Sequence, residues 1–210
     1  MNITIFGATG LVGKQLVKIA LFAGHKVTAY GRNVYELISE EERDQNLVLV
    51  KGGLFDKTDV ADAIKNADIV LSAIGGANNN NDNTRSLGIK NITEAMLQQG
   101  VTRIIAIGGL GCLQATADTL MVDTESFPEE YKAVTTEHLK ALEYLKNSGL
   151  NYTFVCPPTI VDTAEYTTYK TNKDYAIESY TINVNNLAAF ILAEATENIF
   201  VQCKVAIGNS

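Results

Sequence analysis

The chain has 210 residues, of which 46% are hydrophobic and 20% are charged, and its formal net charge is -7. This length suffices for one substantial core and is too short to need two, so we expect a single domain over residues 1–210. The acidic balance and the scattered Lys and Arg residues argue against a nucleic-acid partner or an anionic membrane surface.

Taken in chain order, short runs rich in β-branched residues alternate with longer segments of helical period. The sequence predicts seven strands, at 2–6, 26–30, 47–51, 68–74, 103–108, 152–156 and 203–208. Helical spacing of apolar residues predicts helices within 11–22, 60–64, 87–97, 134–145 and 187–195. Nearly continuous apolar strands indicate a mainly parallel sheet with helices on both faces, so the fold class is α/β, a doubly wound Rossmann domain.

Two polar segments interrupt this alternation. Residues 75–83 (GGANNNNDN) follow the fourth strand and are typical of a mobile surface loop. Residues from about 161 to 181 are rich in tyrosine, and we expect a substrate-side loop or hairpin there. Both segments are expected beside the carboxyl ends of the strands, where doubly wound folds bind ligands.

The remaining features narrow the setting. Three cysteines, Cys112, Cys156 and Cys203, form no C-x-x-C pair, and with two histidines the chain offers no metal-ligand cluster. No signal-peptide pattern and no apolar run of roughly 20 residues occurs. We therefore expect a reduced, cytoplasmic environment, no membrane contact and no metal.

The stretch FGATGLVGK, residues 6–14, places Gly7, Gly10 and Gly13 between a predicted strand and a predicted helix. In that context glycines permit a tight turn, a close approach of the backbone to a pyrophosphate, and close packing of helix on strand. The pattern predicts a dinucleotide-binding site, although glycines at such a junction are also found as simple turn residues.

The end of the second strand distinguishes between the two nicotinamide cofactors. NAD-binding domains usually carry an acidic residue there for the ribose 2′-hydroxyl, whereas this chain has Tyr30-Gly31-Arg32-Asn33. The Arg32 guanidinium could pair with a 2′-phosphate, so NADP(H) is predicted in preference to NAD(H); the other interpretation is a solvated surface arginine.

Three stretches, GATGLVG, VTAYGRN and SGLNYTFVCPPTIVD, together resemble the atypical short-chain dehydrogenase/reductase superfamily. Within it the chain is similar to the NAD(P)H-binding, NmrA-like family, and to the compact members that include flavin reductase. The resemblance implies an NAD(P)H-binding oxidoreductase and covers nearly the whole chain. Its most specific part is residues 135–162, with a histidine-containing helix, a turn, a strand and a Pro-Pro pair.

This resemblance implies a set of site residues. The phosphate loop would be Gly7, Thr9, Gly10, Leu11 and Val12; Arg32 would bind the 2′-phosphate; and Ala73, Ile74 and Gly75 would support the adenosine ribose. The nicotinamide side would be lined by Ile107, Gly108, Gly109, Cys156, Pro157 and Pro158, with His138 as the candidate catalytic residue.

The chain also departs from the family's pattern. Gly52-Gly53 stands where the family has Gly-Asp, which weakens the expected adenine contact unless Asp56 substitutes. The serine that ends the family's fifth strand is replaced by Gly108-Gly109, and Thr159 follows the Pro-Pro pair where a histidine is found in the biliverdin-reducing member. Biliverdin reduction is therefore not expected.

The chemistry that survives needs no strong acid or base from the protein. A Tyr-x-x-x-Lys pattern at Tyr166–Lys170 lies outside the expected helix and is interpreted as coincidental. Hydride transfer to a flavin or quinone depends on orientation more than on a protein proton donor, so a small-molecule electron acceptor of that kind is the leading expectation, with flavin as a substrate. Tyr166, Tyr169 and Tyr175 are candidates for stacking on it.

Two alternatives stay open. One is a non-catalytic NADP(H)-binding protein that senses redox state and regulates a partner. The other is a reductase of small carbonyl compounds that uses His138 as its acid, with a pH dependence near the histidine pKa. The oligomeric state is left undetermined.

Overall fold

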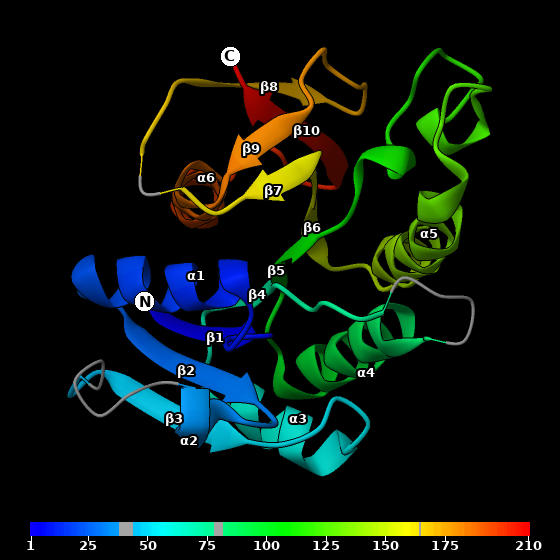
Figure 1. Ribbon diagram of the computed structural model, residues 1–210. Helices are drawn as coiled ribbons and strands as arrows, with labels where there is room; N and C mark the ends of the chain where they lie inside the picture. The colour runs from blue at the N-terminus through cyan, green and yellow to red at the C-terminus, as the bar shows by residue number, and fades with distance from the viewer. Residues whose placement is uncertain (38–43, 78–81, 164) are drawn as a thin grey trace.

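A central sheet of eight strands runs through the residues described in this computed structural model, which are 1–37, 44–77, 82–163 and 165–210 (Figure 1). The strand order is β3-β2-β1-β4-β5-β6-β10-β8, with the reversal at β1 that doubly wound folds show. The strands of this sheet are β1 (Asn2–Phe6), β2 (Lys26–Gly31), β3 (Leu47–Lys51), β4 (Ile69–Ser72), β5 (Arg103–Ile107), β6 (Asn151–Cys156), β8 (Tyr169–Lys173) and β10 (Cys203–Asn209).

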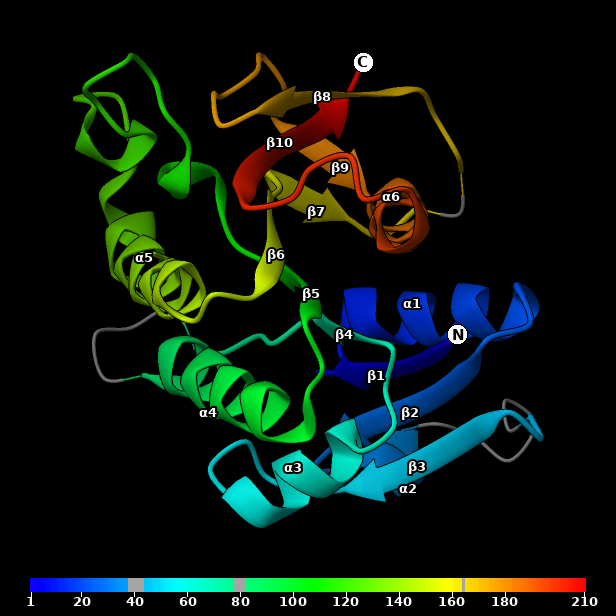
Figure 2. The ribbon, with the colours of Figure 1, turned by 180° about the vertical axis from the view of Figure 1, so that it is seen from behind.

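Helices cover both faces of the sheet. The helices are α1 (Leu11–Phe22), α2 (Val34–Leu37), α3 (Lys57–Ile64), α4 (Thr84–Gln99), α5 (Lys132–Asn147) and α6 (Val184–Glu197). Two separate apolar cores show which helices share a face: α1 and α6 pack on one side, and α3, α4 and α5 pack on the other. Figures 1 and 2 show the same division from opposite directions. None of the helices described is long and apolar enough to cross a membrane.

The first strand shows why the strands read as continuous apolar runs. Ile3 and Ile5 point into the core beneath α1, and Phe6 points into the core beneath α3 and α4. Thr4 also faces α3 and satisfies its hydroxyl there by donating to the Ala63 carbonyl at 2.7 Å. Because helices cover both faces of the sheet, the side chains on both faces of the strand are buried. The alternation of apolar and polar residues that marks a half-exposed strand is therefore absent from the sequence.

The prediction of seven strands was one short for this sheet. The eighth, β8, pairs antiparallel with β10, from Tyr169 opposite Asn209 to Lys173 opposite Val205. Its sequence YKTNK is largely exposed, so it carries no apolar alternation by which it could have been recognised. An edge strand is held by backbone hydrogen bonds on one side only, and these do not depend on side-chain type.

The tyrosine-rich segment has further structure. β7 (Thr159–Val161) and β9 (Thr181–Asn183) form a separate parallel pair that encloses β8 in the sequence. Ser179 at the end of this segment donates to the Asn209 carbonyl at 2.9 Å, and Asn209 Nδ2 in turn reaches the Thr181 hydroxyl at 3.3 Å. The segment is therefore tied to the carboxyl end of β10.

Candidate functional site

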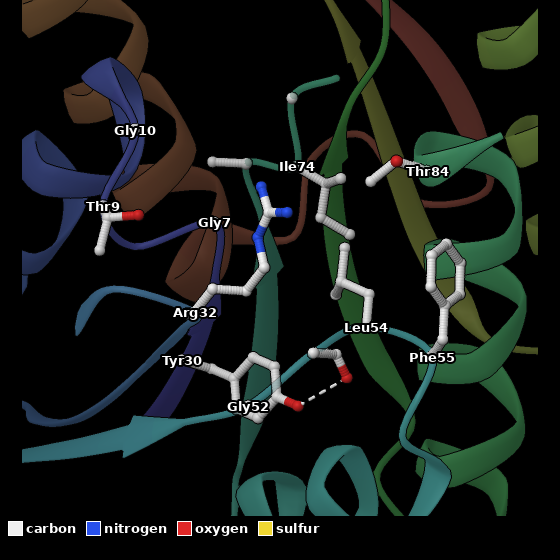
Figure 3. A pocket seen from close by; sticks show the side chains of 14 residues that line it. Gly7, Thr9, Gly10, Tyr30, Arg32, Gly52, Leu54, Phe55, Ile74 and Thr84 are labelled. Carbon is white, nitrogen blue, oxygen red and sulfur yellow. Dashed lines mark hydrogen bonds between the residues drawn. The ribbon is translucent and has the colours of Figure 1, made fainter. Parts of the chain in front are cut away.

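A pocket of about 320 Å³ opens at the carboxyl ends of β1, β2, β3 and β4 (Figure 3). This is the edge of a parallel sheet at which doubly wound folds bind nucleotides. Its lining residues are Gly7, Thr9, Gly10, Tyr30, Gly31, Arg32, Gly52, Gly53, Leu54, Phe55, Ala73, Ile74, Gly75 and Thr84. The predicted residues Gly7, Thr9, Gly10, Arg32, Ala73, Ile74 and Gly75 thus come together in one place.

The glycine turn after β1 forms the inner wall of this pocket. Gly7 has φ +74, a left-handed conformation that side chains rarely adopt, and a Cβ there would collide with the Ala73 carbonyl. A Cβ on Gly13 would collide with the Gly7 carbonyl, so both positions need glycine. Gly10 is the N-cap of α1, whose first turn contains no acidic residue. The positive end of the helix dipole therefore faces the pocket without an internal counter-charge.

Two further residues of the predicted phosphate loop take different positions. Val12 is buried in the core beneath α1, so only its backbone faces the turn. Leu11 is exposed on the first turn of the helix.

Arg32 directly follows β2 and projects its guanidinium into the pocket between Thr9 and Ile74 (Figure 3). It is an exposed residue and forms no salt bridge with any residue that the structure describes. No carboxylate is found among the lining residues that the structure describes. The pocket therefore combines the helix N-terminus with a guanidinium that has no acidic partner in the described part of the chain, an arrangement suited to phosphate groups.

The outer wall is built by the loop that follows β3. The Tyr30 ring is buried beneath Gly52, where any Cβ would collide with the ring, and its hydroxyl donates to the Gly53 carbonyl at 2.9 Å. Burial is the main reason that the pKa of the Tyr30 phenol is raised, with the Asp59 and Asp56 carboxylates adding to it. This phenol therefore stays protonated and serves as a fixed support.

Asp56 does not take the place of the missing acid at the adenine end. Its Oδ1 accepts hydrogen bonds from the backbone N–H groups of Thr58 and Asp59 at 3.0 and 3.1 Å, so it caps α3. It is not among the residues that line the pocket. The suggestion that Asp56 substitutes is therefore wrong, because its carboxylate is committed to the helix N-terminus.

Sequence reasoning missed four side chains of this pocket, those of Tyr30, Leu54, Phe55 and Thr84. Leu54 and Phe55 could have been found from their position, since they follow the third strand at the ligand-binding edge. Thr84 begins α4 after the Asn-rich stretch, and nothing in the local sequence marks it.

The residues expected on the nicotinamide side lie outside this pocket, at the ends of β5 and β6. The two strands are neighbours, and the Gly108 N–H donates to the Val155 carbonyl at 2.7 Å, which extends their pairing past Ile107. Gly108 is backed by the Phe154 ring, which leaves no room for a Cβ.

At the end of β6, the residues expected beside the nicotinamide are mostly buried. Cys156 and Pro157 are buried, whereas Pro158 is half-buried. Burial raises the pKa of the Cys156 thiol well above its usual value, and contact with Cys112 adds to the effect. Cys156 is therefore a protonated core side chain, so only its backbone remains for a ligand contact.

His138 lies on α5 beside this second group. The ring packs against Gly109, where a Cβ would stand 3.2 Å from the His138 Cδ2 atom, and its edge meets the Phe154 ring with centroids 6.4 Å apart. Burial, followed by the positive charge of Arg85, lowers the pKa of His138 to about 3, against a smaller opposing effect of Glu137. This shift favours the neutral imidazole, which argues against His138 as an imidazolium acid in the carbonyl-reductase alternative.

Polar groups at the contact of α4 with α5 set this environment. The Arg85 guanidinium donates to the carbonyls of Gly76 and Ala77, both at 2.9 Å, and so fixes the chain after β4. The buried Glu137 carboxylate accepts from the Ser86 hydroxyl at 2.6 Å and from the Lys140 ammonium at 2.9 Å.

The segment 75–83 is described only in part. Residues 78–81 fall outside the described residues, so the predicted mobile loop is not assessed there. On either side the chain is held: Asp82 accepts from the N–H groups of Ala77 and Thr84, and Arg85 holds the carbonyls of Gly76 and Ala77.

The Tyr166–Lys170 pattern does not lie on a helix. Tyr169 and Lys170 belong to the edge strand β8, and Tyr166 is exposed just before it. Tyr169 packs edge-on against Phe190 of α6, with centroids 6.2 Å apart, so part of its ring is used in packing. Tyr166, Tyr169 and Lys170 are not among the residues that line the pocket at Gly7.

A glycine turn at a helix N-terminus, at the reversal point of a parallel sheet, defines the class of Rossmann dinucleotide-binding proteins. A family profile described as NAD(P)H-binding matches residues 7–198. The chain belongs to this NAD(P)H-binding family, within the atypical short-chain dehydrogenase/reductase group that the sequence motifs resemble.

Known proteins agree with this assignment. An uncharacterized Bacillus subtilis protein, YwnB, is 30% identical over 184 residues, which are 84% of this chain and 82% of that protein. A Streptococcus pneumoniae protein named as a candidate NADH-flavin reductase superposes with a TM-score of 0.85 at 23% identity over the whole of both chains. A Veillonella parvula short-chain dehydrogenase/reductase in complex with NADP gives a TM-score of 0.80 at 20% identity, covering 99% of this chain and 94% of that one.

Proposed function

We propose that this protein is an NADPH-dependent oxidoreductase that transfers a hydride to a flavin or a quinone-like acceptor. The observation that carries the cofactor preference is Arg32. Its guanidinium enters the pocket without a salt bridge to a described residue, beside the Gly7–Gly10 turn, and none of the described lining residues carries a carboxylate. A 2′-phosphate would supply an anion for Arg32, whereas a 2′-hydroxyl would find no acidic partner among these lining residues.

The proposed acceptor is supported by the groups at the carboxyl ends of β5 and β6. Gly108 and Gly109 present backbone rather than side chains there, and the neighbouring imidazole of His138 is neutral. A carbonyl substrate would need a proton from the protein as the hydride arrives. A flavin or quinone accepts the hydride into a conjugated ring and takes its proton from solvent, so orientation by the protein is sufficient.

The solved relatives support the proposal without deciding it. The Streptococcus pneumoniae protein named as a candidate NADH-flavin reductase shares the fold over its full length, and the Veillonella parvula protein was crystallised with NADP. Both are less than 25% identical to this chain, so the acceptor and the preference for NADPH rest on the residues described above.

The test is consumption of NADPH and NADH, followed by the loss of reduced-nicotinamide absorbance, with FMN, riboflavin or a simple quinone as acceptor. We expect acceptor-dependent oxidation that scales with protein concentration and is faster with NADPH than with NADH. Equal rates with both cofactors would contradict the assignment of Arg32. If NADPH is not oxidised with any of these acceptors, the reductase function is contradicted.

A second candidate is a non-catalytic NADP(H)-binding protein that senses redox state. The environment of His138 favours it, because burial disfavours the charged form of the imidazole that packs against Gly109. The same assay separates the two functions: saturable NADPH binding without consumption would select the sensor.

A further inference from the structure

We propose that the base end of this pocket holds the purine ring by shape and apolar contact and does not read its 6-substituent. The protein should then bind dinucleotides of adenine and of hypoxanthine with similar affinity, and Gly53 is the position that sets this tolerance. The inference rests on the proposed binding of NADP(H) in the pocket and adds a substrate specificity to it.

The base is placed by the two ends of the pocket already described. A pyrophosphate at the Gly7–Gly10 turn and a 2′-phosphate at Arg32 leave the purine beyond the ribose, toward the loop after β3. There Leu54 and Ile74 point toward each other, and Phe55 stands at the outer side (Figure 3). Phe55 is exposed in this structure, and the volume of about 320 Å³ is at the lower end for ligand pockets, which suits one half of a dinucleotide.

Two backbone acceptors of this wall already have hydrogen-bond donors. The Gly53 carbonyl accepts from the Tyr30 hydroxyl at 2.9 Å and from the Asp56 N–H at 3.0 Å, which accounts for both of its lone pairs. The Leu54 carbonyl accepts from Asn91 Nδ2 at 2.9 Å. An adenine 6-amino group, which is a hydrogen-bond donor, would compete at these two carbonyls with donors that are already in place.

Side chains add no stronger reader. The described lining residues include no Asp or Glu, and Asp56 caps α3. Thr84 lines the pocket, and its hydroxyl could contact the 6-substituent of the purine. A hydroxyl both donates and accepts, so it serves a 6-amino or a 6-oxo group equally. Discrimination between purines arises when one of them leaves a buried polar group unpaired, and this wall offers no such group among its described side chains.

The two adjacent glycines separate the structural role from the specificity role. A Cβ at Gly52 would collide with the Tyr30 ring, so that position is closed to side chains. A Cβ at Gly53 meets no atom within 4 Å, and Gly53 does not have a positive φ. A side chain can therefore be added at Gly53 without strain, and it would stand at the pocket wall.

The experiment compares dissociation constants for NADPH and for reduced nicotinamide hypoxanthine dinucleotide phosphate, measured by titration of nicotinamide fluorescence. Wild type is expected to bind the two within about 5-fold of each other, since no charged reader is present. Gly53→Asp is expected to shift the ratio in favour of adenine by about 10-fold, the effect of one hydrogen bond to a charged acceptor. The ratio within each variant cancels any repulsion between the new carboxylate and the phosphates.

Gly53→Ala is the matched control, because it adds the Cβ without a carboxylate and should keep the wild-type ratio. Gly53→Glu offers the same charged acceptor on a longer side chain and guards against poor folding of the Asp variant; thermal melting checks each protein. A wild-type preference for adenine of about 20-fold or more would overturn the inference and leave NADPH binding intact. An unchanged ratio in both Gly53→Asp and Gly53→Glu would overturn the role of Gly53. Failure to bind either dinucleotide would overturn the proposed function as well.

Discussion

Lys26 begins β2 and Arg32 directly follows its other end, and of the two only Arg32 lines the pocket. Both are exposed basic residues, so their contribution to cofactor binding differs by position alone. The difference allows the 2′-phosphate assignment to be tested against a change of the same charge.

Arg32→Ala is expected to weaken NADPH binding by about 10-fold or more, because it removes a charge-assisted contact, and to leave NADH binding little changed. Lys26→Ala is the matched control and should leave both affinities unchanged. Isothermal titration with each cofactor measures the effect. Equal losses for NADPH and NADH, or no loss, would refute the assignment.

His138 shows a second effect that belongs to a single residue. Its folded-state pKa is about 3, mainly because the ring is buried, whereas the unfolded chain titrates near 6.5. Between these values the unfolded state binds more protons than the folded state, so the free energy of unfolding falls as the pH is lowered through this window. The groups that influence the ring are Arg85, which lowers its pKa further, and Glu137, which opposes the shift.

His138→Gln is expected to remove this part of the acid sensitivity. Wild type should lose stability relative to the variant by at most about 1.4 kcal/mol per pH unit below pH 6.5, and the two should run parallel above it. Denaturant unfolding between pH 5 and 8 measures the difference, in which the carboxylates common to both proteins cancel. Parallel curves throughout would mean that the His138 pKa is not lowered.

At the scale of the element, α3 shows how a residue that looked functional is structural. Its polar first turn, KTD, follows Asp56, and the carboxylate takes up two N–H groups that would otherwise lack partners. The same loop places Leu54 and Phe55 at the pocket. One short connection therefore both starts a helix and forms a wall of the site.

Asp56→Ala is expected to lower the free energy of unfolding by about 1 kcal/mol, the usual cost of losing an N-cap, while leaving the intrinsic affinity for NADPH within about twofold. Asp62→Ala, which removes the same charge from an exposed later position of α3, is the control and should have a smaller effect on stability. Chemical denaturation and cofactor titration are the measurements. A large loss of affinity without loss of stability would place Asp56 at the adenine after all.

At the scale of the whole molecule, the two ends of the parallel strands have different roles. The carboxyl ends carry the pocket, whereas the amino ends carry a buried ion pair between Arg103 and Glu194 at 2.7 Å. Glu194 also accepts from the Thr153 hydroxyl and from the N–H groups of Ile199 and Phe200. These contacts join β5, β6, α6 and the chain leading into β10.

Glu194→Ala is expected to destabilise the protein by about 3–5 kcal/mol, because it leaves the buried Arg103 guanidinium without its counter-charge. Glu197→Ala, an exposed change on the same helix, should cost less than about 0.5 kcal/mol. The free energies of unfolding in urea give both values. A Glu194→Ala protein of wild-type stability would show that the pair contributes nothing.

The sequence was sufficient for the elements whose signal is local. α1 runs from Leu11 to Phe22 as predicted, β1 and β3 have the predicted bounds, and the doubly wound α/β class is confirmed. Apolar period and turn glycines are properties of neighbouring residues, so they are visible without a structure. The edge strand β8 was missed because its pairing with β10 is a backbone interaction between exposed polar residues.

The phosphate turn was likewise determined by the sequence, because Gly7 has a positive φ within the turn itself and Gly13 is required by its contact with the Gly7 carbonyl. Only the tertiary structure decided that Arg32 shares a pocket with Leu54, Phe55 and Thr84, and that burial lowers the pKa of His138. Those properties depend on distances between residues far apart in the chain and on burial, and neither is encoded in local spacing.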